Sequence, residues 1–134
     1  MRSTSSFSFL RQVLTVDAVG SGAIGLGLWL FAPAFGSLLN LPVELLREVG
    51  LILLPFAALV GFIASRQHPS RIGVWIVIAI NALWVLDSIF LLFADDIEPN
   101  VLGYAFLIVQ AVAVGVIAEL EFIGLRRASQ AVMA

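Results

Sequence analysis

The chain has 134 residues, of which 61% are hydrophobic and only 12% are charged, whereas soluble domains are roughly 45–50% apolar and 25% charged. A soluble domain is therefore excluded. The formal net charge is −2, there is no lysine, and the seven arginines are scattered singly or in pairs, so the chain lacks the basic stripe that neutralises nucleic-acid phosphates. The absence of cysteine excludes disulfides, thiolate metal sites and iron–sulfur clusters.

The first long apolar stretch runs from Leu10 to Phe35, and about 20 apolar residues suffice to cross a hydrocarbon core about 30 Å thick. Arg2 and the segment Ala32-Pro33-Ala34 imitate a secretory signal with its cleavage site. The stretch is longer than the apolar region of a signal peptide, however, and it contains Asp17. We therefore expect an uncleaved first transmembrane helix.

Three further apolar stretches follow, at Val43 to Ser65, Ile72 to Ala94 and Val101 to Leu125. The segments between the stretches are short and rich in Pro, Gly, Asn and Asp, which stop helices or cap their starts. Loops this short place consecutive helices side by side and antiparallel. The sequence predicts an all-α, integral membrane four-helix bundle with up-down-up-down topology, forming a single transmembrane domain over residues 1–134.

The arginines are distributed unevenly between the two ends of the expected bundle. Arg47 is at one end, and the others gather at the opposite end: Arg2, Arg11, Arg66, Arg71, Arg126 and Arg127. Cytoplasmic segments of membrane proteins carry an excess of arginine and lysine. We therefore expect both termini to be cytoplasmic.

The two halves of the chain resemble each other in sequence. The segment 27–30 aligns with 82–85, each containing Leu-Trp, and 60–64 aligns with 114–118, at offsets that differ by one residue. Duplication of one helical hairpin would explain this match. Chance would explain it as well, because apolar spans draw on few residue types.

Small residues spaced four apart form ridges on three of the expected helices. They are Ser21 and Gly25 in the first stretch, Ala57 and Gly61 in the second, and Ala111 and Gly115 in the last. Residues four apart share a helix face, and small side chains let membrane helices approach closely. We expect these six residues to lie at helix contacts.

Two acidic residues are expected at a similar depth on the cytoplasmic side. At 1.5 Å per residue, Asp17 lies about 9 Å beyond Arg11, and Glu119 lies about 10 Å before Arg126. If the first and last helices are neighbours, the two carboxyls approach each other away from water, which favours one proton shared by both. The alternative is that each acid reaches an arginine or interfacial water.

Other polar residues are expected within the last two helices. Asp87 and Gln110 lie at a similar depth, which predicts a hydrogen bond between these helices, and Asn81 lies on a neighbouring face. Helix packing explains all three residues, and a polar pocket or small-molecule site is the alternative. Glu121 shares a face with Gln110, nearly opposite to Glu119, and is expected to extend to the membrane interface.

The sequence offers no catalytic, cofactor or metal site. It has no nucleophile motif, glycine-rich phosphate loop or Walker sequence, and the single His68 cannot supply bis-histidine haem ligation or a three-ligand zinc site. We expect a protein that is not an enzyme and has no cofactor.

Three segments, Leu54 to Leu59, Asn81 to Ser88 and Ala118 to Phe122, resemble segments of small four-span bacterial inner-membrane proteins that have no assigned activity. The resemblance covers most of the chain. It implies a bacterial inner membrane, and it supplies no activity, cofactor or catalytic residue.

Two functions fit these observations. The favoured one is a non-catalytic accessory, scaffold or assembly subunit, because every polar feature has a packing explanation; its partners would be the lipid bilayer and a second copy of this chain or another membrane protein. The alternative is a small proton-coupled transporter or channel acting as an oligomer, with Asp17 and Glu119 as proton carriers and Asp87, Asn81 and Gln110 lining the path. Transport predicts a continuous polar lane, whereas a scaffold predicts isolated polar pairs.

Overall fold

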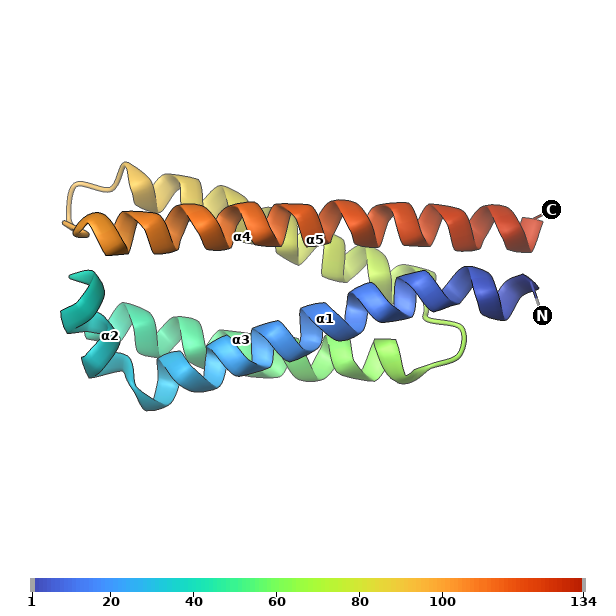
Figure 1. The fold of residues 1–134 in the computed structure, drawn as a ribbon, viewed down its shortest axis with the longest axis horizontal. Helices are drawn as coiled ribbons and strands as arrows, with labels where there is room; N and C mark the ends of the chain where they lie inside the picture. The colour runs from blue at the N-terminus through green and yellow to red at the C-terminus, as the bar shows by residue number, and fades with distance from the viewer. Residues whose placement is uncertain (1, 134) are drawn as a thin grey trace.

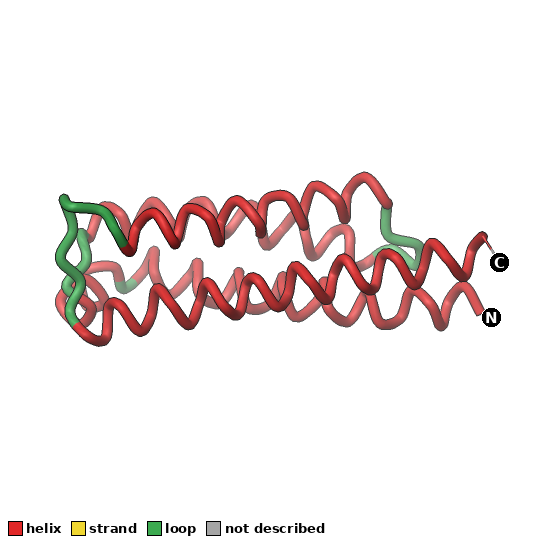
Figure 2. Tube along the Cα trace, turned by 90° about the horizontal axis from the view of Figure 1, so that it is seen from above, coloured by secondary structure: helices red, strands yellow, loops and turns green. Residues whose placement is uncertain are grey.

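The computed structural model describes the backbone of residues 2–133 and the side chains of residues 7–129. Over this range the chain forms five helices and no strand: α1 (Arg2–Leu30), α2 (Ala32–Leu39), α3 (Val43–Ser65), α4 (Arg71–Leu92) and α5 (Val101–Met133). The four long helices run alternately up and down, and the two termini lie at the same end (Figure 1 and Figure 2). The predicted all-α, antiparallel four-helix bundle is confirmed.

Each long helix contains a segment that is long and apolar enough to cross a membrane: Phe7–Leu30, Val43–Ser65, Arg71–Leu92 and Val101–Ser129. The outward surfaces of these helices are apolar as well, and Leu83 and Phe90, for example, are 65% and 72% exposed. Apolar surface exposed on every helix is suited to lipid rather than water. The chain therefore has the architecture of a multi-pass membrane protein.

The first span ends earlier than predicted. The apolar pattern extends to Phe35, but α1 ends at Leu30 and α2 begins at Ala32. Pro33, in the first turn of α2, has no N–H to donate, and its ring would clash with a carbonyl of the preceding turn if α1 continued. Asn40, whose φ of 56° lies in the left-handed region, then ends α2.

At the end that carries the termini, α1 and α5 extend beyond the predicted spans. α1 begins at Arg2 rather than Leu10, and α5 ends at Met133 rather than Leu125. The predicted limits followed the apolar stretch, but a helix need not end where it leaves the apolar layer. The two ends project past the α3–α4 loop (Figure 1).

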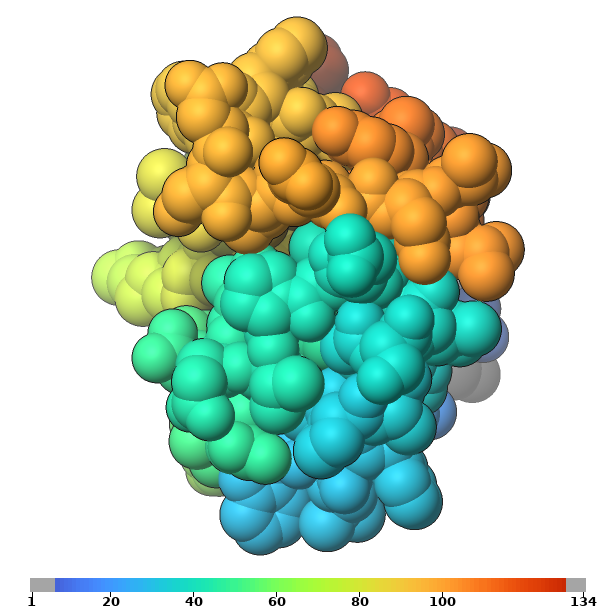
Figure 3. All heavy atoms as spheres, turned by 90° about the vertical axis from the view of Figure 1, so that its left-hand side faces the viewer, coloured from blue at the N-terminus to red at the C-terminus, as the bar shows by residue number. Residues whose placement is uncertain are grey.

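The short helix α2 covers the end of the bundle opposite the termini. Asn100 Nδ2 donates a hydrogen bond of 2.8 Å to the carbonyl of Leu38, and the Asn100 backbone N–H donates one of 3.2 Å to the carbonyl of Leu39. Asn40 Nδ2 donates to the carbonyl of Glu98. These bonds tie α2 to the α4–α5 loop, and Figure 3 shows α2 lying between the start of α3 and the start of α5.

The bundle is not packed equally on all sides. α1 packs along α3 and also against α5, and α4 packs on α5. In contrast, α3 and α4 make few contacts, although only the short loop 66–70 joins them. A seam is therefore left between α3 and α4.

Glycines allow the close approach of α1 and α3. A Cβ on Gly50 would lie 2.7 Å from the Gly25 carbonyl oxygen and 2.7 Å from the Trp29 backbone nitrogen. A Cβ on Gly25 would lie 2.9 Å from the Leu53 Cβ. Because no real side chain tolerates such contacts without backbone movement, glycine at these two positions sets the distance between the two helices.

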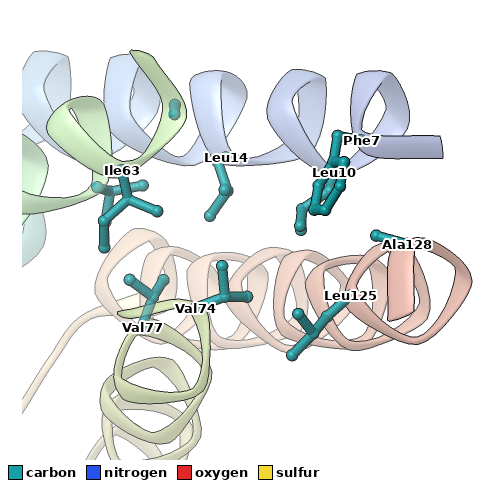
Figure 4. Close-up of a cluster of buried hydrophobic side chains, with 10 residues drawn as sticks. Phe7, Leu10, Leu14, Ile63, Val74, Val77, Leu125 and Ala128 are labelled. Carbon is teal, nitrogen blue, oxygen red and sulfur yellow. The ribbon is translucent and has the colours of Figure 1, made fainter. Parts of the chain in front are cut away.

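Two clusters of apolar side chains fill the interior, one toward each end. The end of the bundle that carries the termini and most of the arginines is called the arginine end below, and the opposite one the α2 end. The arginine-end cluster consists of Phe7, Leu10, Leu14, Val60, Ile63, Ala64, Val74, Val77, Leu125 and Ala128. Figure 4 shows its labelled side chains converging from α1, α3, α4 and α5. The α2-end cluster consists of Leu28, Ala32, Leu39, Leu41, Leu46 and Leu53. Between these two clusters lie the buried polar residues.

We predict that Gly50→Ala lowers the thermal stability of the purified protein in detergent, because separating α1 from α3 costs about 1–3 kcal/mol of packing free energy. Gly61→Ala is the matched control, since its Cβ would lie 3.8 Å from the Ala18 Cβ, an ordinary contact. Helix melting followed by circular dichroism measures both. Equal melting temperatures for the two variants would show that the close approach does not hold α1 and α3 together.

Candidate functional site

A group of four polar side chains, here called the polar cluster, lies inside the bundle: Asp17 and Ser21 of α1, Asn81 of α4 and Glu121 of α5. Asn81 Nδ2 donates a hydrogen bond of 2.9 Å to Asp17 Oδ2 and a second of 2.9 Å to Glu121 Oε1. Ser21 Oγ donates to Asp17 Oδ1 at 3.1 Å. Asp17 is 5% exposed, Asn81 4% and Glu121 0%. One amide group thus joins three helices.

Helix periodicity explains why these residues meet. Asp17 and Ser21 are four residues apart, so they share a face of α1. Asn81 and Ser88 are seven residues apart on α4, and Gln110 and Glu121 are eleven apart on α5, which again places each pair on one face. With α4 and α5 antiparallel, Asn81 meets Glu121 toward the arginine end, and Ser88 meets Gln110 nearer the α2 end.

The carboxyls of the polar cluster have no arginine partner among the described side chains. Among the described side chains, the one ion pair joins Arg47 to Glu44 at 3.0 Å, and it lies on the surface, away from the polar cluster. Arg11, the arginine nearest to Asp17 along α1, donates from Nε to the carbonyl of Ala64 at 3.1 Å, which ties α1 to the end of α3. Glu121 Oε2 is buried, and no side chain or backbone group in the described part of the chain forms a hydrogen bond with it.

The structure replaces Glu119 with Glu121 as the acid that faces Asp17. Glu119 is exposed on α5, so its expected pairing with Asp17 is wrong. The expectation that Glu121 extends to the interface is also wrong, because this side chain is fully buried. The inward face of α5 is the stripe that contains Ala111 and Leu125, both buried, and Glu121 belongs to this stripe because it lies four residues before Leu125.

A second polar group lies nearer the α2 end of the bundle. Trp84 Nε1 donates a hydrogen bond of 2.8 Å to Gln110 Oε1, and Gln110 Nε2 donates one of 2.8 Å to Ser88 Oγ. Ser88 Oγ in turn donates to the carbonyl of Trp84 at 2.8 Å. The predicted hydrogen bond between Asp87 and Gln110 is wrong. Asp87 is exposed because it lies one residue off the inward face of α4.

The residues expected on small-residue ridges lie as follows. A Cβ on Gly22, near Ser21, would lie 3.5 Å from the Ala57 Cβ, so α1 and α3 also face each other there. Gly61 faces Ala18 of α1 at ordinary contact distance, and Gly115 faces Val85 of α4, where a Cβ would lie 3.9 Å from Val85 Cγ2. Gly25 meets α3 closely, as described above, and Ala111 is 9% exposed. The tight approach therefore involves Gly25 but not Gly61 or Gly115.

A cavity of about 160 Å³ lies at the centre of the bundle. Asp17 and Ser21 line its end nearest the polar cluster, and Trp84, Ser88 and Gln110 line part of its wall. The rest of the lining is mostly apolar and comes from all four long helices, including Ile24, Leu28, Leu46, Leu53, Leu107 and Val114. The central cavity is therefore an apolar chamber with a carboxyl group at one end.

A hollow of about 360 Å³ lies in the seam between α3 and α4. Two exposed acids, Glu48 and Asp87, line this hollow. It shares Val49, Trp84 and Ser88 with the wall of the central cavity, so the two spaces are neighbours. Within the described part of the chain, no basic side chain lines either space.

Among the described residues, no group of three or more His, Cys, Asp or Glu side chains is placed to hold a metal ion. Scans against protein-family models, curated proteins and solved structures found no match to this chain. What the protein does must therefore be inferred from the polar cluster, the central cavity and the seam.

We predict that Asn81→Ala destabilises the protein by about 2 kcal/mol or more, because it leaves two buried carboxyls without their common donor. Ser88→Ala is the control for loss of an ordinary interhelical contact, which costs only about 0.6–2 kcal/mol. Unfolding in detergent by a denaturant titration compares the two variants. If Asn81→Ala were no more destabilising than Ser88→Ala, the amide would not be the group that holds α1, α4 and α5 together.

Proposed function

We propose that the protein is a small proton-coupled transporter or channel, not an enzyme, that acts as an oligomer in a bacterial inner membrane. The observation that carries this proposal is the position of Glu121, whose side chain is fully buried while its Oε2 has no hydrogen-bond partner among the described residues. An unsatisfied polar atom in an apolar interior costs free energy. An acid kept inside a membrane bundle at this cost is a candidate for a role beyond packing.

In this proposal, Asp17 and Glu121 share one proton. Their oxygens accept from the same Asn81 nitrogen, so the two carboxyls lie within two hydrogen-bond lengths of each other. Two negative charges this close repel strongly where water is excluded, and no described basic side chain is paired with either. A proton on one carboxyl removes the repulsion and also supplies a donor, so the pair gains or loses it as a unit.

The surroundings of the polar cluster favour proton access from the α2 end. The central cavity and the hollow in the seam lie on that side of Asp17. Toward the arginine end, the interior is filled by Leu10, Leu14 and Val74, which are all fully buried. Transport would require this apolar barrier to open, and α4, which contributes Val74 to it, packs mainly on α5 and makes few contacts with α3.

A second candidate function, a non-catalytic accessory or scaffold subunit, is favoured by a different observation. The hydrogen bonds among Trp84, Ser88 and Gln110 form a group complete in itself. The arginine-end cluster also interrupts any polar lane between the two ends. Isolated polar groups are what helix packing alone requires. The two candidates differ in whether the proton of the polar cluster exchanges with water.

We expect infrared spectra of the lipid-embedded protein to show a protonated carboxyl band at neutral pH that shifts in heavy water and disappears in alkali. Glu121→Gln should remove this band, because the shared proton needs both carboxyls. Glu119→Gln is the matched control and should leave the band unchanged, since Glu119 lies exposed on α5.

Two results of this titration would contradict the proposal. Absence of any protonated carboxyl band at neutral pH would mean that the two acids do not share a proton. A band that neither titrates nor exchanges in heavy water would identify a permanently protonated structural contact, and this result would favour the scaffold function.

The proposed orientation places both termini in the cytoplasm, because the arginine end carries Arg11, Arg66, Arg71, Arg126 and Arg127. A reporter that works only in the cytoplasm should therefore be active when fused after Ala134. A reporter that works only in the periplasm should be active when inserted in the α4–α5 loop. The opposite pattern in the two fusions would contradict this orientation and place both termini in the periplasm.

A further inference from the structure

We propose that the central cavity binds a small apolar ammonium ion, meaning an aromatic or branched alkyl group that carries one protonated amine. This inference rests on the proposed function and names the substrate class for it. Three features carry it: the size of the cavity, the placement of its acidic groups, and the path by which such an ion would enter.

The size and lining of the cavity set the apolar part of the ligand. An apolar cavity of roughly 150 Å³ in a protein core accommodates one benzene molecule, and the central cavity measures about 160 Å³. Side chains of Ile24, Leu28 and Leu53 are among those that line it. A group the size of a phenyl ring fits this space and would remain among apolar side chains.

The end of the cavity sets the polar part of the ligand. Asp17 lies there, with one oxygen accepting from Ser21 and the other from Asn81. A carboxylate has about four lone-pair positions, so both oxygens can still accept from an ammonium group. No described basic side chain lines the cavity, and a cationic ligand would therefore supply the counter-charge that the protein does not.

The seam provides a path of matching charge. Glu48 and Asp87 line its hollow, which borders the cavity at Val49, Trp84 and Ser88. α2 covers the end of the bundle, whereas α3 and α4 make few contacts with each other. An amphipathic cation at the membrane surface would therefore enter sideways between α3 and α4, attracted by the two acids.

Binding of the ion would be coupled to release of the shared proton. The empty pair of Asp17 and Glu121 holds one proton and one negative charge in the proposed function. When an ammonium ion binds with its full charge, the proton leaves the pair for bulk water. Two carboxylates then face one ammonium ion, and the net charge of the site stays at −1. One proton is released for each cation bound, no covalent bond forms, and the amine keeps its own proton throughout.

The test uses the full-length protein in phosphatidylcholine nanodiscs, with benzylammonium as the probe and empty nanodiscs as the blank. Isothermal titration should show saturable binding of benzylammonium and no comparable binding of benzyl alcohol, which has the same shape without the charge. Asp17→Asn should weaken benzylammonium binding by at least about tenfold, because it removes the charged partner of a buried ion pair.

A second variant tests the location without touching a charge. Gly20 lines the cavity, and a Cβ on it would meet no heavy atom within 4 Å. Gly20→Phe should therefore fill the cavity, leave the protein folded and abolish binding. Gly61→Ala, which lies outside the cavity lining, is the matched control and should bind benzylammonium as the unchanged protein does.

The outcomes separate this inference from the proposed function. Equal binding of benzyl alcohol and benzylammonium, or unchanged binding by Gly20→Phe, would overturn the ammonium site. No binding by a protein whose infrared band titrates and exchanges would overturn the site and leave proton exchange standing. Saturable binding without proton release, followed with a pH indicator in weak buffer, would support the site and contradict proton coupling.

Discussion

Asn81 donates its two amide hydrogens to two carboxyl groups that are buried inside the bundle. Hydrocarbon cannot form hydrogen bonds with a polar side chain, so the hydrogen-bond partners of such a side chain must come from neighbouring helices. Asp17 comes from α1 and Glu121 from α5, and both must reach the same nitrogen on α4. This requirement fixes the rotation and the height of three helices relative to one another, and the bonds of Gln110 with Trp84 and Ser88 continue the same α4–α5 register.

The remaining helix, α3, is held by a different interaction. Gly25 and Gly50 bring its backbone against α1, and no comparable contact draws it to α4. The seam between α3 and α4 and the central cavity beside it follow from this difference. A bundle in which α3 and α4 packed as closely as α1 and α3 would have no space next to Asp17. The proposed path of an ammonium ion therefore depends on the same packing that ties α1 to α3.

The fold could be predicted from the sequence because apolar stretches of membrane-spanning length and short loops leave few alternatives to an antiparallel bundle. The predicted first span runs past the break at Phe31 because Ala32 to Phe35 are apolar, so an apolar pattern does not show that Pro33 interrupts the helix. The site was predicted only in part. The sequence places Asp17 and Asn81 among the polar residues of the spans, but the similar depth of Asp17 and Glu119 favours the wrong acid on α5. A signal for Glu121 was present, since it shares a face with Gln110, and Gln110 was expected to contact the preceding helix.

The central claim is that Asp17 and Glu121 hold one proton between them through Asn81. Solid-state NMR of the lipid-embedded protein, with ¹³C-labelled aspartate and glutamate carboxyls, follows both groups directly as the pH is changed. We predict that Asp17→Asn changes the pH range over which the Glu121 signal shifts, whereas Glu119→Gln leaves this range unchanged. A Glu121 signal unaffected by Asp17→Asn would contradict this account.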